Sequence, residues 1–555
     1  MPASLIFHNV RVLTMEPPHQ RAKAVAVAGD RVLAVGSEGW VARQRGSQTR
    51  LVDGRGLTLL PGFIDAHCHL LSYAASLLSV DCSPSAVRSI GDIQAALAAA
   101  AARTPEGRWL RAVGYDETDL AEGRHPTRWD LDLAVPRHPV RLVHRTGRAC
   151  VLNSRAMTLV GLDAGSEEPP GGYIERDPST GEPTGLLLEM NDFVDPFVPA
   201  LPYEELSAGV GQAAQAFLSE GVTAIQDATA TNGRREWALF RRLMAEGYLP
   251  LSVTLMEGYR HLGELPEADG ALPLRRGPVK VVIAELGEEL HPGPEELTET
   301  VWHVHEAGRQ VAIHAVGEAA VAAAAQALAG ALRRRPRLRR AFRPSLRPRA
   351  QPSRRDHRHR IEHCGVCRPA LARRLAALGV LVVTQPSFVY HNGDRYLRQV
   401  PAEDLPYLYP LRTLLEAGVP LAAGSDAPVA PPGPLSGLAG ATRRLSSGGA
   451  AVARHQAVSV GEALAMHTRA AAYAAFEEGE RGSLRAGKRA DLVLLSGLPV
   501  RPACPAGRQA GDALSEESVH DLTVEMTVVG GEIAWQRGEA VPSPHTCPTH
   551  GRPLS

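Results

Sequence analysis

Two histidines separated by one residue end an apolar segment, in the stretch LLPGFIDAHCHL at residues 59–70. The segment is typical of a β-strand, in which alternate side chains point to the same face. His67 and His69 would therefore direct both imidazoles at a common object, while Cys68 points to the other face. Neutral imidazole is the commonest metal ligand in proteins, so the spacing indicates a metal site.

Two other His-x-His triplets show that the motif alone is weak evidence. His303 and His305 lie in EELTETVWHVHEAGRQ, whose pattern predicts a helix. Residues i and i+2 of a helix are about 200° apart around its axis, so these two cannot chelate one ion. His357 and His359 end a run of arginines, where we expect solvated side chains. Other residues must therefore decide the interpretation of His67 and His69.

Composition and charge favour an ordinary soluble protein. The hydrophobic share of 44% and the charged share of 22% are typical of globular chains. Sixty basic against sixty acidic residues give no overall attraction to nucleic acid or to a membrane surface, and we expect neither as a partner. We expect no signal peptide and no membrane span, because no apolar run approaches roughly 18–20 residues. Seven scattered cysteines favour a cytoplasmic location.

Short apolar segments alternate with helix-like segments through the middle of the chain. After GFIDAHCHL, strand-like segments occur at 222–228, 251–256, 279–285, 310–316, 359–364, 381–387 and 420–429. Counting the first, they make eight β-then-α units. This pattern predicts an α/β fold, a (β/α)8 TIM barrel, whose active site forms at the carboxyl ends of the strands.

The two ends of the chain are both rich in short β-like segments broken by glycine and aspartate. We expect them to form one small β-sandwich domain, and we expect a large insertion after strand one of the barrel. The predicted division is residues 1–60 as the first part of the sandwich, 61–79 as barrel strand one, 80–204 as an inserted lid subdomain, 205–475 as the rest of the barrel, 476–540 as the second part of the sandwich and 541–555 as a flexible tail.

An arginine-rich run, RRRPRLRRAFRPSLRPRAQPSRRDHRHR, occupies residues 333–360. Such a run could bind a polyanion. It lacks the interleaved aromatic residues on which bases stack, and proline interrupts it repeatedly. We interpret residues 333–358 as a solvated insert in the barrel.

Polar residues near the ends of the predicted strands would converge on one pocket. Strand one ends in two histidines, strand four begins with a lysine, strands five and six each carry a histidine, and strand eight carries an aspartate. These residues are His67, His69, Lys280, His314, His363 and Asp426. Buried polar groups without partners are costly, and metal coordination would supply partners for the histidines and the aspartate.

On these motifs the chain resembles the amidohydrolase superfamily, in the branch typified by N-substituted formamide deformylase. The resemblance covers nearly the whole chain. Its motifs occur in order, from DGRGLTLLPGFIDAHCHL and RAVGYDE through PTRWDLD, VPRHPVRLVHRTGRACVLNSRAM, GGYIERDPSTGEPTGLL, EGVTAIQDA and VAIHAVGEAA to HRIEHC, TQPSF, GSDAPV and GSLRAGKRADLVLL.

The resemblance implies a metal centre and a reaction. His67 and His69 would bind the more buried ion, and His314 and His363 would bind a second one. Lys280, carboxylated by CO2 to a carbamate, would bridge the two ions. The ions would be Zn2+, with Mn2+ or Fe2+ as alternatives, and one ion alone would suffice if Lys280 is unmodified. Asp426 would ligate and shuttle a proton while metal-activated hydroxide attacks the carbonyl of a small amide, with an N-substituted formamide as an example.

Two alternatives to a hydrolase of non-peptide C–N bonds stay open. One is a lyase or isomerase on the same metal-binding barrel, because a fold does not determine a function. The other is a non-catalytic scaffold that has kept the barrel. A homodimer also stays open.

The chain departs from the family pattern where substrate would be held. The family often has His where this chain has Arg148, Asp where it has Glu318, and an Asp-Gly-Ser stretch where VVIAELGEE follows Lys280. We hypothesise that Arg148 contacts an anionic part of the substrate, because a guanidinium forks onto carboxylates. A salt bridge inside the insertion is the alternative. Tyr115 and Asp116, in GYDE, would line the same mouth.

Overall fold

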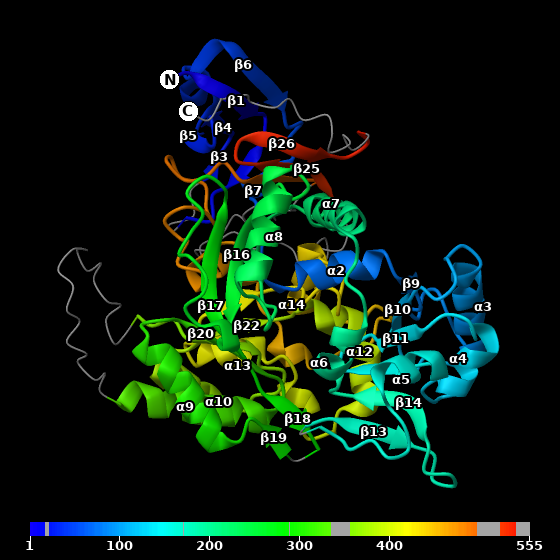
Figure 1. Cartoon of the computed structure of the whole chain (residues 1–555). Coiled ribbons are helices and arrows are strands. Elements are labelled where there is room, and N and C mark those ends of the chain that lie inside the picture. Colours follow the sequence, from blue (N-terminus) through cyan, green and yellow to red (C-terminus); the bar gives the residue numbers. More distant parts are fainter. Residues whose placement is uncertain (17–20, 170, 288, 335–355, 497–521, 540–555) are drawn as a thin grey trace, which may run out of the picture. The chain divides into compact units, whose positions relative to one another are not determined.

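Eight parallel strands form a nearly closed barrel in the computed structural model, which describes residues 1–16, 21–169, 171–287, 289–334, 356–496 and 522–539 (Figure 1). Each strand pairs with the next along the chain, in the order β8 (Phe63–Cys68), β15 (Val222–Asp227), β16 (Ser252–Gly258), β17 (Leu274–Val282), β20 (Val311–Ala315), β21 (Arg360–His363), β22 (Leu381–Thr384) and β23 (Leu421–Ala423). This order confirms the prediction of a TIM-like barrel.

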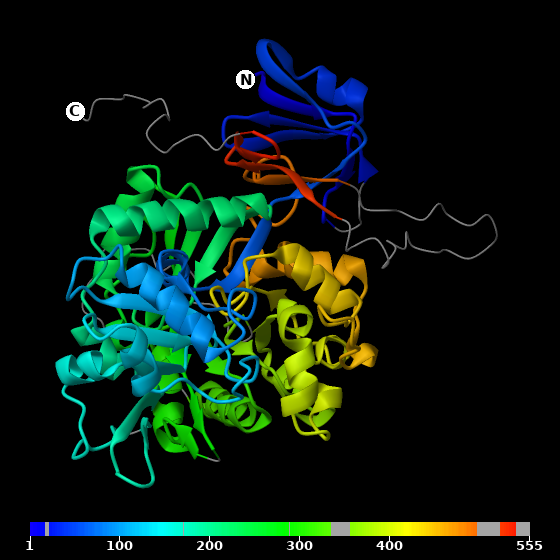
Figure 2. The same cartoon turned by 90° about the vertical axis from the view of Figure 1, so that its right-hand side faces the viewer.

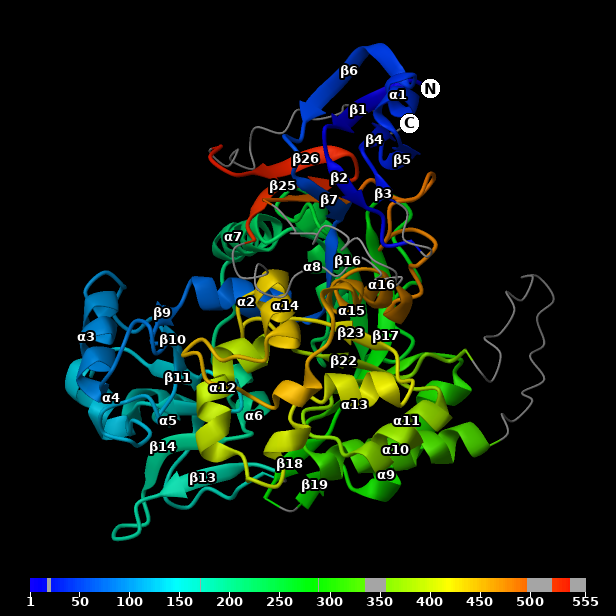
Figure 3. The same ribbon diagram turned by 180° about the vertical axis from the view of Figure 1, so that it is seen from behind.

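Short helices follow most of the barrel strands. They are α8 (Arg234–Ala245), α9 (Pro294–Glu306), α10 (Glu318–Arg333), α11 (Pro369–Leu378), α12 (Ser387–Gln399), α13 (Leu411–Glu416), α14 (Pro434–Thr442), α15 (Val460–Met466) and α16 (Arg469–Ala474). Helices α9, α10 and α11 lie side by side along one flank of the barrel (Figure 3). Helix α11 ends at a glycine, Gly379, which has a left-handed φ of 66°. None of the described helices combines the length and the apolar character that a membrane crossing requires.

Strands from both ends of the chain pair with one another, and they lie side by side in blue and red in Figure 2. One sheet has the order β26 (Glu532–Gln536), β25 (Val524–Val529), β24 (Leu492–Leu495), β7 (Thr58–Pro61), β2 (Arg11–Leu13) and β3 (Arg21–Ala22). A second has the order β5 (Arg31–Gly36), β4 (Ala24–Ala28), β1 (Ala3–His8) and β6 (Arg45–Asp53), with α1 (Glu38–Ala42) between β5 and β6. One buried apolar cluster draws residues from both sheets, including Phe7, Leu59 and Leu492. That the two sheets form one sandwich domain stays a prediction.

Residues 70–213, with 286–291, pack as a separate compact unit. Its sheet has the order β13 (Tyr173–Arg176), β14 (Pro183–Leu188), β12 (Ala149–Leu152), β11 (Val140–His144), β10 (Leu110–Tyr115) and β9 (Val80–Asp81). Its helices include α2 (Leu70–Leu77), α3 (Ile90–Ala101), α4 (Arg128–Ala134) and α5 (Ser154–Val160). Buried Asn153 caps α5 by accepting from the Ala156 N–H, and its amide donates to two backbone carbonyls.

Two expectations are corrected. Strand β17 begins at Leu274, so Lys280 lies near its carboxyl end and not at its start. His357, Arg358 and His359 are buried, not solvated. The Arg358 guanidinium pairs with Asp356 and Glu478 and lies 3.8 Å from the centroid of the Tyr473 ring, so partners from distant segments draw it inside. Residues 335–355 of the arginine-rich insert and the tail at 541–555 lie outside the described residues.

A fully buried arginine organises the interior of the barrel. Arg360 on β21 donates to both carboxylate oxygens of Glu362, at 2.5 and 2.9 Å. It also donates to the side-chain oxygen of Gln226 on β15 at 2.5 Å and to the carbonyl oxygen of Ala66 on β8 at 2.7 Å. One guanidinium therefore ties three strands together, and its charge is balanced by Glu362.

Replacing Arg360 with methionine should lower the free energy of unfolding by about 3–5 kcal/mol, because it leaves the Glu362 carboxylate buried without its counter-charge. Arg373 is exposed on α11, and its replacement with methionine is the matched control. Urea unfolding followed by circular dichroism measures both variants. Equal midpoints for the two variants would contradict the role given to Arg360.

Candidate active site

The residues predicted to meet at the carboxyl ends of the strands do come together. Nε2 of His69 lies 3.1 Å from Oδ1 of Asp426, and Nε2 of His67 lies 3.5 Å from the same oxygen. The side chain of His67 is fully buried, that of Asp426 is 11% exposed and that of His69 is 26% exposed. One side of the cluster therefore faces the interior, and the other side is partly exposed.

Lys280, His363 and His314 extend the cluster. Nζ of Lys280 lies 3.4 Å from Nε2 of His67, and Nδ1 of His363 lies 4.0 Å from Oδ2 of Asp426. Nε2 of His363 is 2.8 Å from Nδ1 of His314. All six predicted residues therefore belong to one chain of short contacts.

Oxygen atoms behind the imidazole rings set their orientation. Nδ1 of His67 donates to the Glu362 carboxylate at 2.5 Å, and Nδ1 of His363 donates to the side-chain oxygen of Gln385 at 2.8 Å. Nδ1 of His69 is 3.1 Å from the hydroxyl oxygen of Thr229. An imidazole that donates from Nδ1 presents the lone pair of Nε2 to the site, which is how metal-binding histidines are usually held.

The atoms that face one another fit a cation between them. Burial lowers the pKa of His67 well below its usual range, so its ring is neutral and Nε2 carries a lone pair. That lone pair faces a carboxylate oxygen of Asp426. Two ligand atoms about 2.1 Å from a tetrahedral zinc ion are roughly 3.4 Å apart, close to the 3.5 Å observed between His67 and Asp426.

Two of these residues have an unusual backbone conformation. His363 has a φ of 71° and Asp426 a φ of 58°, both in the left-handed region that few non-glycine residues adopt. In a regular strand, His363 and its neighbour Glu362 would point to opposite faces. Here both contact the cluster around His67, because the strand geometry ends at His363. Such outliers concentrate at functional sites.

A buried carboxylate holds the seam between β8 and β23. Asp65 accepts the backbone N–H groups of His67 and Ser425, each at 3.0 Å, and the Asp426 N–H donates to the carbonyl oxygen of His67 at 2.8 Å. Burial raises the pKa of Asp65 to about 6 in spite of these bonds. The first and last barrel strands, each carrying candidate ligands, are thereby fixed relative to each other.

Lys280 and Asp426 have opposite electrostatic situations. Burial lowers the pKa of Lys280 to about 8, which brings its neutral amine within reach of physiological pH. Burial would raise the pKa of Asp426, but the hydrogen bond from His69 and the neighbouring histidines outweigh it and hold the pKa below the usual range. Asp426 is therefore ionised at neutral pH.

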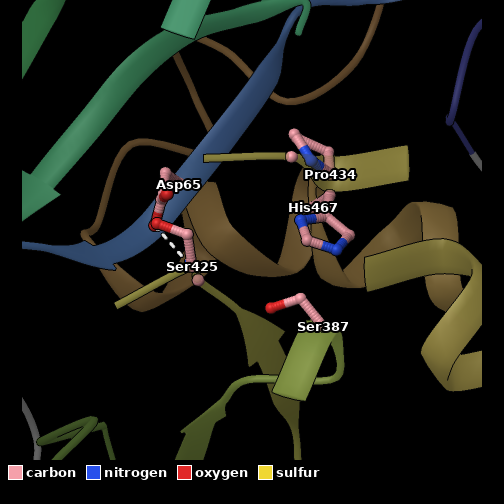
Figure 4. A pocket seen from close by; sticks show the side chains of 7 residues that line it. Asp65, Ser387, Ser425, Pro434 and His467 are labelled. Carbon is pink, nitrogen blue, oxygen red and sulfur yellow. Dashed lines mark hydrogen bonds between the residues drawn. The ribbon is translucent and has the colours of Figure 1, made fainter. Parts of the chain in front are cut away.

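A small cavity lies beside the seam, lined by Asp65, Ser387, Ser425, Pro434 and His467 together with Gly424 and Gly433 (Figure 4). Burial lowers the pKa of His467 to about 4, so its ring is neutral at neutral pH. None of the six candidate ligands lines this cavity. The cavity is therefore separate from the ligand cluster.

Sequence reasoning missed Glu362, Thr229, Gln385, Asp65 and Arg360. Glu362 sits in HRIEHC, next to a predicted ligand, and a charged residue inside a predicted strand is a signal that could have found it. Thr229 directly follows a predicted strand and Gln385 lies within another, but their residue types alone carry no such signal. Only their contacts with His69 and His363 reveal them.

The residues predicted to bind substrate all lie in the compact unit of residues 70–213. Tyr115 is fully buried, and its hydroxyl is 3.0 Å from Nδ1 of His125. Asp116 is buried against Arg145, at 3.3 Å. Arg148 pairs with Glu189, which matches the alternative of a salt bridge inside the insertion. A role in substrate binding for these three stays a prediction.

The chain belongs to the amidohydrolase family, whose model matches residues 50–534. It is 29% identical to N-substituted formamide deformylase of Arthrobacter pascens, over 96% of this chain and 98% of the relative. It is 25% identical to the putative amidohydrolase YtcJ of Bacillus subtilis, over 96% and 99% of the two chains.

Solved structures share the fold. An uncharacterized metal-dependent hydrolase from Pyrococcus furiosus superposes with a TM-score of 0.66 at 24% identity, covering 88% of this chain and 98% of its own. A second, from Pyrococcus horikoshii, has a TM-score of 0.68 at 20% identity, covering 88% and 96%. At these identities the likeness shows the fold alone.

Replacing Glu362 with glutamine should weaken metal binding by about 10- to 100-fold, because the oxygen that fixes the ring of His67 loses its charge. Titration of metal-free protein with Zn2+ against a competing chelator measures the affinity. Glu416 is exposed on α13, and its replacement with glutamine is the control. An affinity equal to that of the control, in a variant with unchanged circular dichroism, would remove Glu362 from the site.

Proposed function

We propose that this protein is a metal-dependent amidohydrolase that cleaves a non-peptide C–N bond of a small amide, with N-substituted formamides as the substrate class. The convergence of the His67 lone pair, His69 and the ionised Asp426 carboxylate on one point carries the proposal. Membership of the amidohydrolase family and the similarity to a formamide deformylase support it.

His67, His69 and Asp426 would hold one divalent ion, with Zn2+ as the best match to two imidazoles and a carboxylate. His314, His363 and a carboxylated Lys280 would hold a second. When bound, such ions polarise a carbonyl and make water acidic enough to act as a nucleophile near neutral pH. The rest of the chemistry is assigned to residues of the chain.

Asp426 would move the proton of the reaction. Its carboxylate is ionised before the reaction, as a general base must be, and accepts a proton from the attacking water. It then returns that proton to the leaving nitrogen, so that water and amide become carboxylic acid and amine. His69, which contacts the same oxygen at 3.1 Å, positions the carboxylate for both transfers.

Lys280 is suited to react with CO2. The neutral amine adds to CO2 and loses a proton, which gives a carbamate with two oxygen donors. With a pKa of about 8, roughly a tenth of the amine is neutral at pH 7, far more than for a lysine of ordinary pKa. The chain contains only three lysines, Lys23, Lys280 and Lys488, which makes the modification easy to assign.

Removing the metal, or one of its ligands, should abolish hydrolysis. Protein purified without chelator should release amine and formate from N-substituted formamides, and His69→Ala should lower kcat/KM at least about a thousandfold, or about 4 kcal/mol. His303→Ala, an exposed histidine on α9, is the control. Chromatography of the amine and an enzymatic formate assay give the readout. Equal rates for His69→Ala and the control would refute the metal-dependent mechanism, whereas release of a different acid would refute only the formamide.

Carboxylation of Lys280 should appear as one carbamate signal in the NMR spectrum of protein equilibrated with carbon-13 bicarbonate. Its amplitude should rise from pH 6.5 to pH 8.5, because the amine loses its proton as the pH passes its pKa. The signal should persist in Lys23→Ala and disappear in Lys280→Ala. A signal that survives in Lys280→Ala, or none in the unaltered protein, would contradict the modification.

A further inference from the structure

A second group of metal-binding side chains, which includes none of the barrel ligands, lies in the unit of residues 70–213. Strands β10 and β11 of this unit run parallel, and Tyr115 at the end of β10 is paired with His144 at the end of β11. Asp116 and Glu117 follow Tyr115 directly. Parallel strands therefore deliver two carboxylates and an imidazole to one edge of the sheet, where α/β proteins commonly bind ligands.

The side chains of Asp116, Glu117 and His144 lie close together. Oε2 of Glu117 lies 3.0 Å from Nε2 of His144 and 3.7 Å from Nδ1 of His125. One ligand atom each from Asp116, Glu117 and His144 lies within 4.8 Å of the others. Such spacing suits atoms that share one ion, since ligand atoms of a tetrahedral zinc site are roughly 3.4 Å apart.

The imidazole of His144 is held as a metal-binding histidine is held. Its side chain is 8% exposed, and its Nδ1 is 2.8 Å from the hydroxyl oxygen of Thr146. Donation from Nδ1 to that hydroxyl leaves the Nε2 lone pair pointing at Glu117. Nε2 of His144 and Oε2 of Glu117 are both buried, and neither has a hydrogen bond of acceptable geometry within the described part of the chain.

The local charge favours a cation. Asp116 and Glu117 bring two carboxylates to the group. The described cation in contact with this pair of acids is Arg145, 3.3 Å from Asp116. Glu117 faces His144 and His125, so a proton on one of these rings or a metal ion would balance its charge. Two buried ligand atoms and a partly exposed His125 at the rim favour the metal ion.

We propose that Glu117 and His144, with Asp116 and His125 completing the shell, form a second divalent-metal site. The donor set of imidazole nitrogen and carboxylate oxygen selects a borderline ion of the Zn2+ class over Ca2+ or Mg2+, which prefer oxygen alone. The proposal uses none of the barrel ligands and does not depend on the reaction proposed for them.

Metal content of the full-length protein tests the proposal. The protein is saturated with Zn2+ and passed through a desalting column before its zinc content is measured. Replacing Glu117 or His144 with glutamine should lower that content by about one ion per chain. His138→Gln is the matched control, because His138 is a buried histidine of the same unit that hydrogen-bonds the Arg108 carbonyl oxygen. His69→Ala reports the barrel centre separately. Equal zinc content in Glu117→Gln, His144→Gln and His138→Gln would overturn the proposal and indicate an ordinary Glu117–His144 hydrogen bond.

A measurement on the unaltered protein covers the case in which the variants do not fold. Crystals soaked with Zn2+ and measured on both sides of the zinc absorption edge should show an anomalous peak between Glu117 and His144. Co2+ in its place should give a visible absorption band that Glu117→Gln removes and His138→Gln retains. A peak at the barrel cluster with none beside Glu117 would refute the second site and leave the proposed amidohydrolase centre intact.

Discussion

The arrangement of the barrel cluster depends on a fully buried chain of contacts from Arg360 through Glu362 to His67. A carboxylate without water must be balanced and hydrogen-bonded, and Glu362 receives both from the guanidinium on one side and the imidazole on the other. Because Glu362 accepts a hydrogen bond from Nδ1 of His67, the Nε2 lone pair of that ring faces Asp426 and Lys280. The Arg360–Glu362 ion pair, on the far side of the His67 ring, therefore determines the tautomer of that ring.

The seam between the first and last barrel strands imposes a second constraint. His67 and Asp426 are separated by most of the chain, yet the backbone joins them directly. The His67 N–H and the Ser425 N–H both donate to Asp65, and the Asp426 N–H donates to the carbonyl oxygen of His67. The end of β8 and the end of β23 can therefore shift only together. The left-handed φ angles of His363 and Asp426 then turn both side chains toward the cluster after the regular strand geometry has ended.

Sequence patterns predicted the strands and the six clustered residues because apolar alternation and polar strand ends are local signals. The sequence patterns failed where contacts between distant segments determine the position of a residue. Arg358 was predicted to be solvated because it lies at the end of an arginine run, but it is buried. Its guanidinium contacts Asp356, Glu478 and the Tyr473 ring. The early start of β17 reflects pairing with β16, which places Lys280 opposite Gly258 and not at a strand start. Glu362 was overlooked because alternation assigns it to the face opposite His363, and no sequence pattern announces a positive φ at a histidine.

The raised pKa of Asp65 carries an energetic consequence for the whole fold. An acid whose folded-state pKa is about 6 and whose unfolded value is near 4 binds its proton more tightly in the native protein. Its contribution to the free energy of unfolding therefore falls as the pH rises through that window, by an amount on the order of 3 kcal/mol. Near neutral pH Asp65 is therefore ionised in the native protein, although its buried surroundings favour the protonated form. The native protein therefore loses conformational stability at the seam where the ends of β8 and β23 are joined. Such a loss is common where activity requires an unfavourable local arrangement.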